Sequence, residues 1–221
     1  MTTLAIAARP IARFDVSALG RSLILLLAGA APVSAIPLFV LTWLPLHDAA
    51  LFVVLPLAVV ATALLVRRSP QAVWAGRGFV AGLVAVFAYD AVRMPLVWTH
   101  VWPDFIPRLG GWVTGAGGTD TVVGYTWRWI GDGGGIGVAF FVFCGLVLTI
   151  RPALVTTRPV LLAIGYGVFV WAGLMATVIL PARGETLLFA ITPATLVLSL
   201  VGHLVYGAVL GLFLRHFVRR A

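Results

Sequence analysis

Long apolar runs make up most of the chain, and short polar connections separate them. Each run is close to or above the ~20 residues that a helix needs to cross a hydrocarbon core of ~30 Å. A helix also satisfies its own backbone hydrogen bonds inside a bilayer, where no water can do so. The pattern therefore predicts six membrane-spanning helices, which we place at residues 22–44, 48–66, 74–100, 121–150, 158–180 and 186–214.

The composition agrees with this pattern. Hydrophobic residues make up 62% of the chain and charged residues only 10%, a balance outside the range of soluble globular domains. Six spans use most of the 221 residues, so the connections must be short. We therefore predict an all-α transmembrane bundle that forms a single domain over residues 1–221.

The charge distribution predicts the topology. The chain has a formal charge of +8, and all 15 basic residues are arginine. These arginines fall between apolar runs rather than in a polar domain, which favours a topological role over nucleic-acid binding. The positive-inside bias places both termini in the cytoplasm, and we expect a bacterial inner membrane. The arginines of the predicted cytoplasmic regions are Arg9, Arg13, Arg21, Arg67, Arg68, Arg77, Arg151, Arg158, Arg215, Arg219 and Arg220.

Two segments flank the spans. Residues 1–20 are expected to lie along the cytoplasmic interface. The first run ends in a motif like a signal-peptide cleavage site at residues 33–35, but it continues through PLFVLTWL, so we interpret it as a retained span. Residues 101–120 form an external loop whose aromatic side chains suit the headgroup region. Its GAGG stretch at 115–118 is compatible with a mobile lid or with an ordinary interfacial loop.

Charged residues inside the spans are the main functional signal. Asp90 and Arg93 are three residues apart in the third span, and Arg128 and Asp132 are four apart in the fourth. Each spacing puts its pair on one helix face, and His203 falls near the middle of the sixth span. A charge at the bilayer centre costs roughly 3 kcal/mol, so such residues face the bundle interior or water.

We interpret these residues as the lining of an outward-facing polar cavity that binds or passes a small solute or a proton. A second interpretation is that the charges form ion pairs that only fix helix orientation. Another alternative is a non-catalytic accessory subunit of a larger membrane complex, whose polar residues and glycines dock a partner. A further one is an intramembrane hydrolase in which Ser199 and His203 form a dyad oriented by Asp90. The predicted cavity residues are Tyr89, Asp90, Arg93, Tyr125, Arg128, Asp132, His203 and Tyr206.

No recognised cofactor or metal motif is present in the sequence. The spacing of His47, Asp48 and His100 matches no known metal site. The stretch GDGGGIG at 131–137 follows no strand, and the chain has no lysine for a nucleotide-binding loop. A single cysteine, Cys144, excludes an internal disulfide. We therefore predict no metal, no cofactor and no nucleic-acid partner, and the bilayer is the expected environment.

Glycines recur at four-residue spacing in the predicted spans. This spacing lets two helix backbones approach closely in a membrane. It predicts helix contacts at Gly78/Gly82, Gly131/Gly135, Gly133/Gly137 and Gly207/Gly211.

Two short stretches resemble known proteins. Residues 129–131 (WIG) and 202–206 (GHLVY), the second followed by an arginine-rich end, are similar to those of the YagU-like small inner-membrane proteins of bacteria. The resemblance implies a polytopic inner-membrane protein linked to envelope or acid stress, with His203 and Tyr206 at matching positions. Arg128 and Asp132 depart from what the resemblance leads us to expect.

Overall fold

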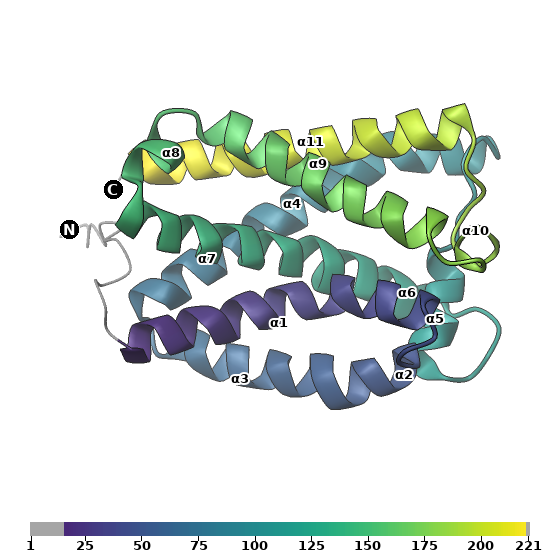
Figure 1. Cartoon of the computed structure of the whole chain (residues 1–221), viewed down its shortest axis with the longest axis horizontal. Coiled ribbons are helices and arrows are strands. Elements are labelled where there is room, and N and C mark those ends of the chain that lie inside the picture. Colours follow the sequence, from purple (N-terminus) through teal and green to yellow (C-terminus); the bar gives the residue numbers. More distant parts are fainter. Residues whose placement is uncertain (1–15, 220–221) are drawn as a thin grey trace.

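The computed structural model describes residues 16–219, and every regular element in that range is helical (Figure 1). Six of its helices are long and apolar enough to cross a membrane, which confirms the predicted fold class and number of spans. The segment predicted to lie along the interface, residues 1–20, falls mostly outside the described range. The six spans are α1 (Val16–Val40); α2, η1 and α3 (Leu46–Ala49, Ala50–Val54, Leu55–Val66); α4 (Pro70–Trp98); α6, η2 and α7 (Thr121–Thr126, Trp127–Gly134, Gly135–Ile150); α9 (Pro159–Ile179); and α11 (Pro193–Arg219).

Short helices occupy three of the connections. They are α5 (Ile106–Thr114), α8 (Pro152–Thr156) and α10 (Gly184–Leu187). In the 101–120 connection, Ile106 and Leu109 of α5 are buried in one apolar cluster with Leu188 and Phe189, which follow α10. This connection therefore packs over one end of the bundle.

Glycines end α5. Gly115, Gly117 and Gly118 have φ values of 70°, 70° and 76°, in the left-handed region that glycine adopts without a steric penalty. Gly115 directly follows the last residue of α5 and caps it. The GAGG stretch is thus needed to reverse the chain, and the proposal that it forms a mobile lid stays a prediction.

The last span begins later than the sequence pattern predicts, at Pro193 rather than at residue 186. Thr192 and Thr195 cap it reciprocally: the Thr192 amide donates to the Thr195 hydroxyl at 2.9 Å, and the Thr195 amide donates to the Thr192 hydroxyl at 3.1 Å. The preceding residues Leu188 and Phe189 continue the apolar run, but they are buried in a loop and not in a helix. An apolar run alone does not distinguish a membrane helix from a buried loop.

The helices pack around α7 (Figure 1). Both α1 and α4 run along it, while α9 packs mainly against α11 and only slightly against α1. The contact between α4 and α7 is a glycine contact, because a Cβ atom built on Gly78 would lie 2.5 Å from the carbonyl oxygen of Gly137. Gly82 approaches the Gly133 carbonyl in the same way. The predicted packing role of these glycines is confirmed.

The second span is the most peripheral one. No residue from Ala50 to Val66 is buried, and large apolar side chains such as Phe52 and Val59 are exposed. Such a surface suits contact with lipid.

Candidate functional site

Asp90 of α4 is the centre of a buried charge cluster. Its Oδ1 accepts a hydrogen bond from Nη2 of Arg128 at 3.0 Å, and its Oδ2 accepts one from the Trp129 indole at 2.9 Å. The separation between Asp90 and Arg93 on the same helix is longer, at 3.8 Å. The shorter ion pair thus crosses between two spans. Both carboxylate oxygens have a donor, which offsets much of the cost of burying the charge.

Arg93 has a partner of its own in the connection that follows α4. Its Nη2 lies 2.5 Å from Oδ1 of Asp104. Asp104 also accepts hydrogen bonds from the Tyr125 hydroxyl at 2.9 Å and from the Ile106 amide at 3.2 Å. Asp104 therefore joins α4, α5 and α6. Asp104 was not predicted as a site residue, because it lies in a loop, where a charge costs little and gives no functional signal.

Arg128 and Asp132 lie in the π-helical segment η2. Segments of this type occur frequently at functional sites. Within residues 16–219 the two side chains form no ion pair with each other, since Arg128 is paired with Asp90. Asp132 is 6% exposed, and its Oδ1 has no hydrogen-bond partner among those residues. One buried carboxyl group is thus left without a cationic neighbour in contact.

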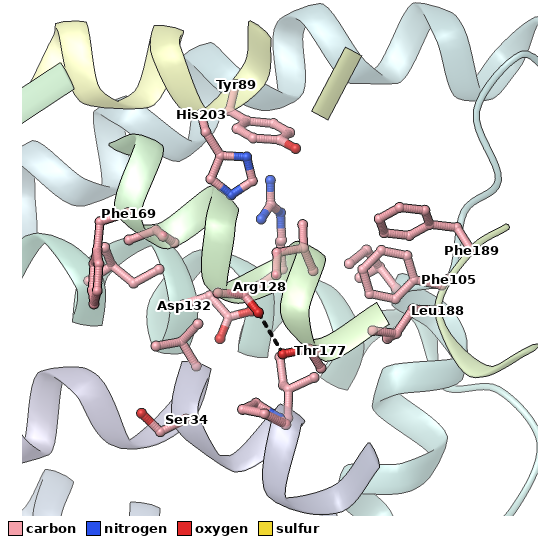
Figure 2. A pocket seen from close by; sticks show the side chains of 18 of the residues that line it. Ser34, Tyr89, Phe105, Arg128, Asp132, Phe169, Thr177, Leu188, Phe189 and His203 are labelled. Atoms are coloured by element: carbon pink, nitrogen blue, oxygen red, sulfur yellow. Dashed lines mark hydrogen bonds between the residues drawn. The ribbon is translucent and has the colours of Figure 1, made fainter. Parts of the chain in front are cut away.

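A cavity of about 300 Å³ lies beside this cluster (Figure 2). Its lining is mostly apolar, and five of the predicted site residues contribute to its polar part: Tyr89, Arg93, Arg128, Asp132 and His203. These come from α4, η2 and α11, the three spans that the sequence analysis selected. The structure therefore brings these five side chains to one cavity.

Two further spans, α1 and α9, also line the cavity, and neither was predicted to do so from the sequence. Ser34 of α1 and Phe169, Gly173 and Thr177 of α9 belong to the lining. These spans carry no charge at cavity depth, so a search for intramembrane charges could not find them. Their signal is weak, since a serine or threonine in a membrane helix commonly bonds to its own backbone. The Thr177 hydroxyl does so, donating to the Gly173 carbonyl at 2.8 Å.

His203 is held in place by one hydrogen bond and one ring contact. Its Nδ1 lies 2.7 Å from the Ser199 carbonyl oxygen, and because that oxygen can only accept, Nδ1 is the donor. The Tyr89 ring packs edge-on against the imidazole at a centroid distance of 5.3 Å. The guanidinium carbon of Arg128 lies over the Tyr89 ring, 4.5 Å from the ring centroid. Tyr89 therefore connects the histidine to the charge cluster (Figure 2).

The Ser199 hydroxyl is not paired with His203. It donates to the Leu196 carbonyl at 3.0 Å and accepts from the Trp171 indole at 3.0 Å. The imidazole instead bonds to the Ser199 main chain. The hydrogen bond between hydroxyl and imidazole that activates a serine nucleophile is therefore not formed in this geometry.

Three of the predicted residues, Asp90, Tyr125 and Tyr206, lie behind the cavity wall rather than on it. Asp90 is paired directly with Arg128, and Tyr125 donates to Asp104, which is paired with Arg93. The Tyr206 hydroxyl donates to the Gly133 carbonyl at 2.6 Å, which fastens η2 to α11. These three residues contact residues of the wall and do not line the cavity themselves.

Metal-ligating side chains do not gather in the described part of the chain. Over residues 16–219, no group of three His, Cys, Asp or Glu side chains is close enough to hold a metal ion. Cys144 is fully buried in the apolar core around α7. The cavity offers apolar and aromatic contact over most of its wall, and hydrogen bonding and ion pairing at its polar part.

Comparisons with protein-family models, with curated proteins and with solved structures found no match to this chain.

Proposed function

We propose that this multi-pass membrane protein binds a small solute in the cavity beside its charge cluster. We propose further that it lies in a bacterial inner membrane with both termini in the cytoplasm, and that it passes the bound solute, or a proton, from this cavity. The six apolar spans are compatible with the membrane location. The arginine distribution supports the orientation.

The observation that supports binding is the incomplete pairing of the polar wall. A buried polar group normally has a hydrogen-bond partner, yet within residues 16–219 neither Oδ1 of Asp132 nor Nε of Arg128 has one. Both residues line the same cavity, together with Tyr89 and His203. A cavity of about 300 Å³ is at the lower end of the range of ligand pockets. Such a site suits a small molecule whose polar group completes the pairing.

Access to the cavity is tested by cysteine labelling. In a Cys144→Ala background, we expect His203→Cys to react with a small membrane-permeant maleimide, because position 203 lines the cavity. Ser199→Cys is the matched control, since position 199 lies one turn away on α11 and is fully buried. Mass spectrometry of the purified protein measures the labelled fraction. Equal inertness of the two cysteines would show that the cavity is closed to solutes and would contradict the proposed function.

The orientation gives a separate prediction. Ala116 and Ala153 are both exposed and lie in connections at opposite ends of the bundle. In the same background, Ala116→Cys should react with a membrane-impermeant thiol reagent in intact cells, and Ala153→Cys should react only after the cells are opened. The reverse labelling pattern would overturn the orientation based on arginine.

A subunit of a larger complex is the second candidate function. The observation that favours it is the second span, in which no residue from Ala50 to Val66 is buried. A partner helix would cover the same apolar surface that lipid covers otherwise. Stoichiometric co-purification of another membrane protein in mild detergent, lost on Val59→Trp, would support this candidate over a solute-binding protein. The resemblance to YagU-like proteins and the intramembrane hydrolase also stay predictions, although the geometry at Ser199 gives the hydrolase no support.

A further inference from the structure

We propose that the cavity takes a lipophilic monocation, such as a protonated alkylamine, which enters from the bilayer between α1 and α9. This inference rests on the proposed function and adds the class of the ligand and its route. Three observations lead to it: the charge balance of the wall, the aromatic lining and the position of the cavity mouth.

The charge cluster and the cavity wall contain one more aspartate than arginine. Two arginines and three aspartates occupy the cluster and the cavity wall. Arg128 is paired with Asp90, and Arg93 with Asp104. Asp132 has no ion pair within residues 16–219, and it is the one of the three acids that lines the cavity. A carboxylate is costly to bury unless a cation compensates it, so a cationic ligand would stabilise the ionised form of Asp132, whereas an anionic ligand would add a negative charge with no free cation to pair it.

The remaining polar wall can also accept a cation. His203 donates through Nδ1 to the Ser199 carbonyl, so in the neutral imidazole Nε2 is left as an acceptor. The arginines do not repel a monocation strongly, since each lies within 3.0 Å of its own carboxylate. Nε2 of His203 thus adds an acceptor beside Asp132, and Nε of Arg128 is a donor on the same wall without a partner among residues 16–219.

The rest of the lining suits an apolar body attached to that cation. Six aromatic side chains surround the cavity, and the faces of such rings attract cations. Apolar side chains from α1 and α9 fill most of the remaining wall. The aromatic residues are Tyr89, Trp102, Phe105, Tyr166, Phe169 and Phe189.

The exposed edge of the cavity lies at membrane depth. Ser34, Phe169 and Gly173 line the cavity and are exposed on the outside of the bundle, and Phe169 is 71% exposed. Phe169 is ten residues from both Pro159 and Ile179, the ends of α9, or about 15 Å from each at 1.5 Å per residue. The slight contact between α1 and α9 leaves this side open. A molecule dissolved in the hydrocarbon region therefore reaches the cavity without passing through water.

Three probes with the same eight-carbon chain test the head group: octylamine, octanol and octanoate. The protein is reconstituted in nanodiscs of zwitterionic lipid, and its thermal unfolding midpoint is measured with each probe. A ligand that binds only the folded state raises this midpoint. We expect octylamine to raise it by several degrees, and octanol and octanoate to have little effect.

Two matched pairs of variants locate the effect. Asp132→Asn should abolish the shift caused by octylamine, whereas Asp48→Asn, the same change outside the cavity, should retain it. Gly173→Trp should reduce the shift by blocking the mouth. Gly165→Trp is its control, because Gly165 does not line the cavity. Both glycines are exposed on α9, and over the described residues 16–219 an added Cβ at either would have no atom within 4 Å.

A second measurement is independent of any change at Asp132. Octylamine should slow maleimide labelling of His203→Cys more than that of the exposed Ala116→Cys, both in the Cys144→Ala background, and this ratio does not depend on any reaction of the amine with the reagent. Octanol should leave the ratio unchanged. Stabilisation by octanol or octanoate that Gly173→Trp removes would overturn the choice of a cation but leave solute binding in place. An octylamine shift that persists in Asp132→Asn, or no shift and no protection from labelling, would overturn the cation inference. The proposal of solute binding would be contradicted only if the cysteine at position 203 is also inert to the maleimide.

Discussion

Asp90→Asn is expected to lower the free energy of unfolding by about 3 kcal/mol, the cost of leaving a buried charge without its partner. The substitution keeps the size of the side chain but removes the negative charge 3.0 Å from Arg128. The Asp90 side chain is only 7% exposed, so water cannot replace the lost interaction. Denaturant or thermal unfolding of the purified protein in detergent measures the loss.

The choice of rescue identifies the partner. Adding Arg128→Gln to Asp90→Asn should recover part of the lost stability, because the double variant no longer buries an unpaired cation. Adding Arg93→Gln should not, since Arg93 lies 2.5 Å from Asp104 and 3.8 Å from Asp90, and its removal leaves Asp104 unpaired. Rescue by Arg93→Gln alone would contradict the pairing between helices that we describe.

The fold was predictable because bilayer physics leaves few alternatives. An apolar run of about 20 residues must form a helix there, and the six runs correspond to the six long helices. What the runs did not define were the ends of some spans: residues 16–21 already belong to α1, which was predicted to begin at 22, and α11 begins at Pro193 rather than at 186. Leu188 and Phe189 are as apolar as a membrane helix, but they are buried in a loop, and the cap at Thr192 decides where α11 begins. A reciprocal threonine cap is a local signal that a search for long apolar runs does not use.

The site was predictable in part, and for the same physical reason. Charged residues are expensive in a membrane, so Asp90, Arg93, Arg128 and Asp132 stood out, and the structure places them around one cluster and cavity. The spacing along each helix suggested the pairs Asp90 with Arg93 and Arg128 with Asp132. It could not show that Arg128 turns to another helix, because that depends on how closely two spans approach.

The partner of Arg93 was missed for a different reason. Asp104 lies outside the spans, where a charge costs little and carries no signal. Only the packing of the 101–120 connection over the bundle brings it to Arg93. Likewise, the apolar half of the cavity comes from α1 and α9, and apolar residues that line a cavity look the same in sequence as those that face lipid.

A glycine contact sets the distance between the two spans that share the Asp90 ion pair, and Gly82→Ala should therefore affect both stability and site. A Cβ atom at position 82 would collide with the Gly133 carbonyl of η2 and lie 3.0 Å from the Gly137 Cα. These are backbone atoms of a facing helix, so relief requires the helices to separate. Overpacking of this kind costs typically 1–3 kcal/mol, and we expect a loss of that size in the free energy of unfolding.

Gly76→Ala is the matched control for this prediction. Gly76 lies on the same helix, and a Cβ atom there has no neighbour within 4 Å in the part of the chain that the structure describes. Alanine should therefore be neutral or stabilise the helix by up to about 1 kcal/mol. Because η2 carries Arg128 and Asp132, its displacement in Gly82→Ala should also weaken the coupling between Asp90 and Arg128, which a double-mutant cycle in that background measures. An unchanged coupling energy together with lower stability would mean that η2 keeps its place and that the strain is relieved along α7 instead.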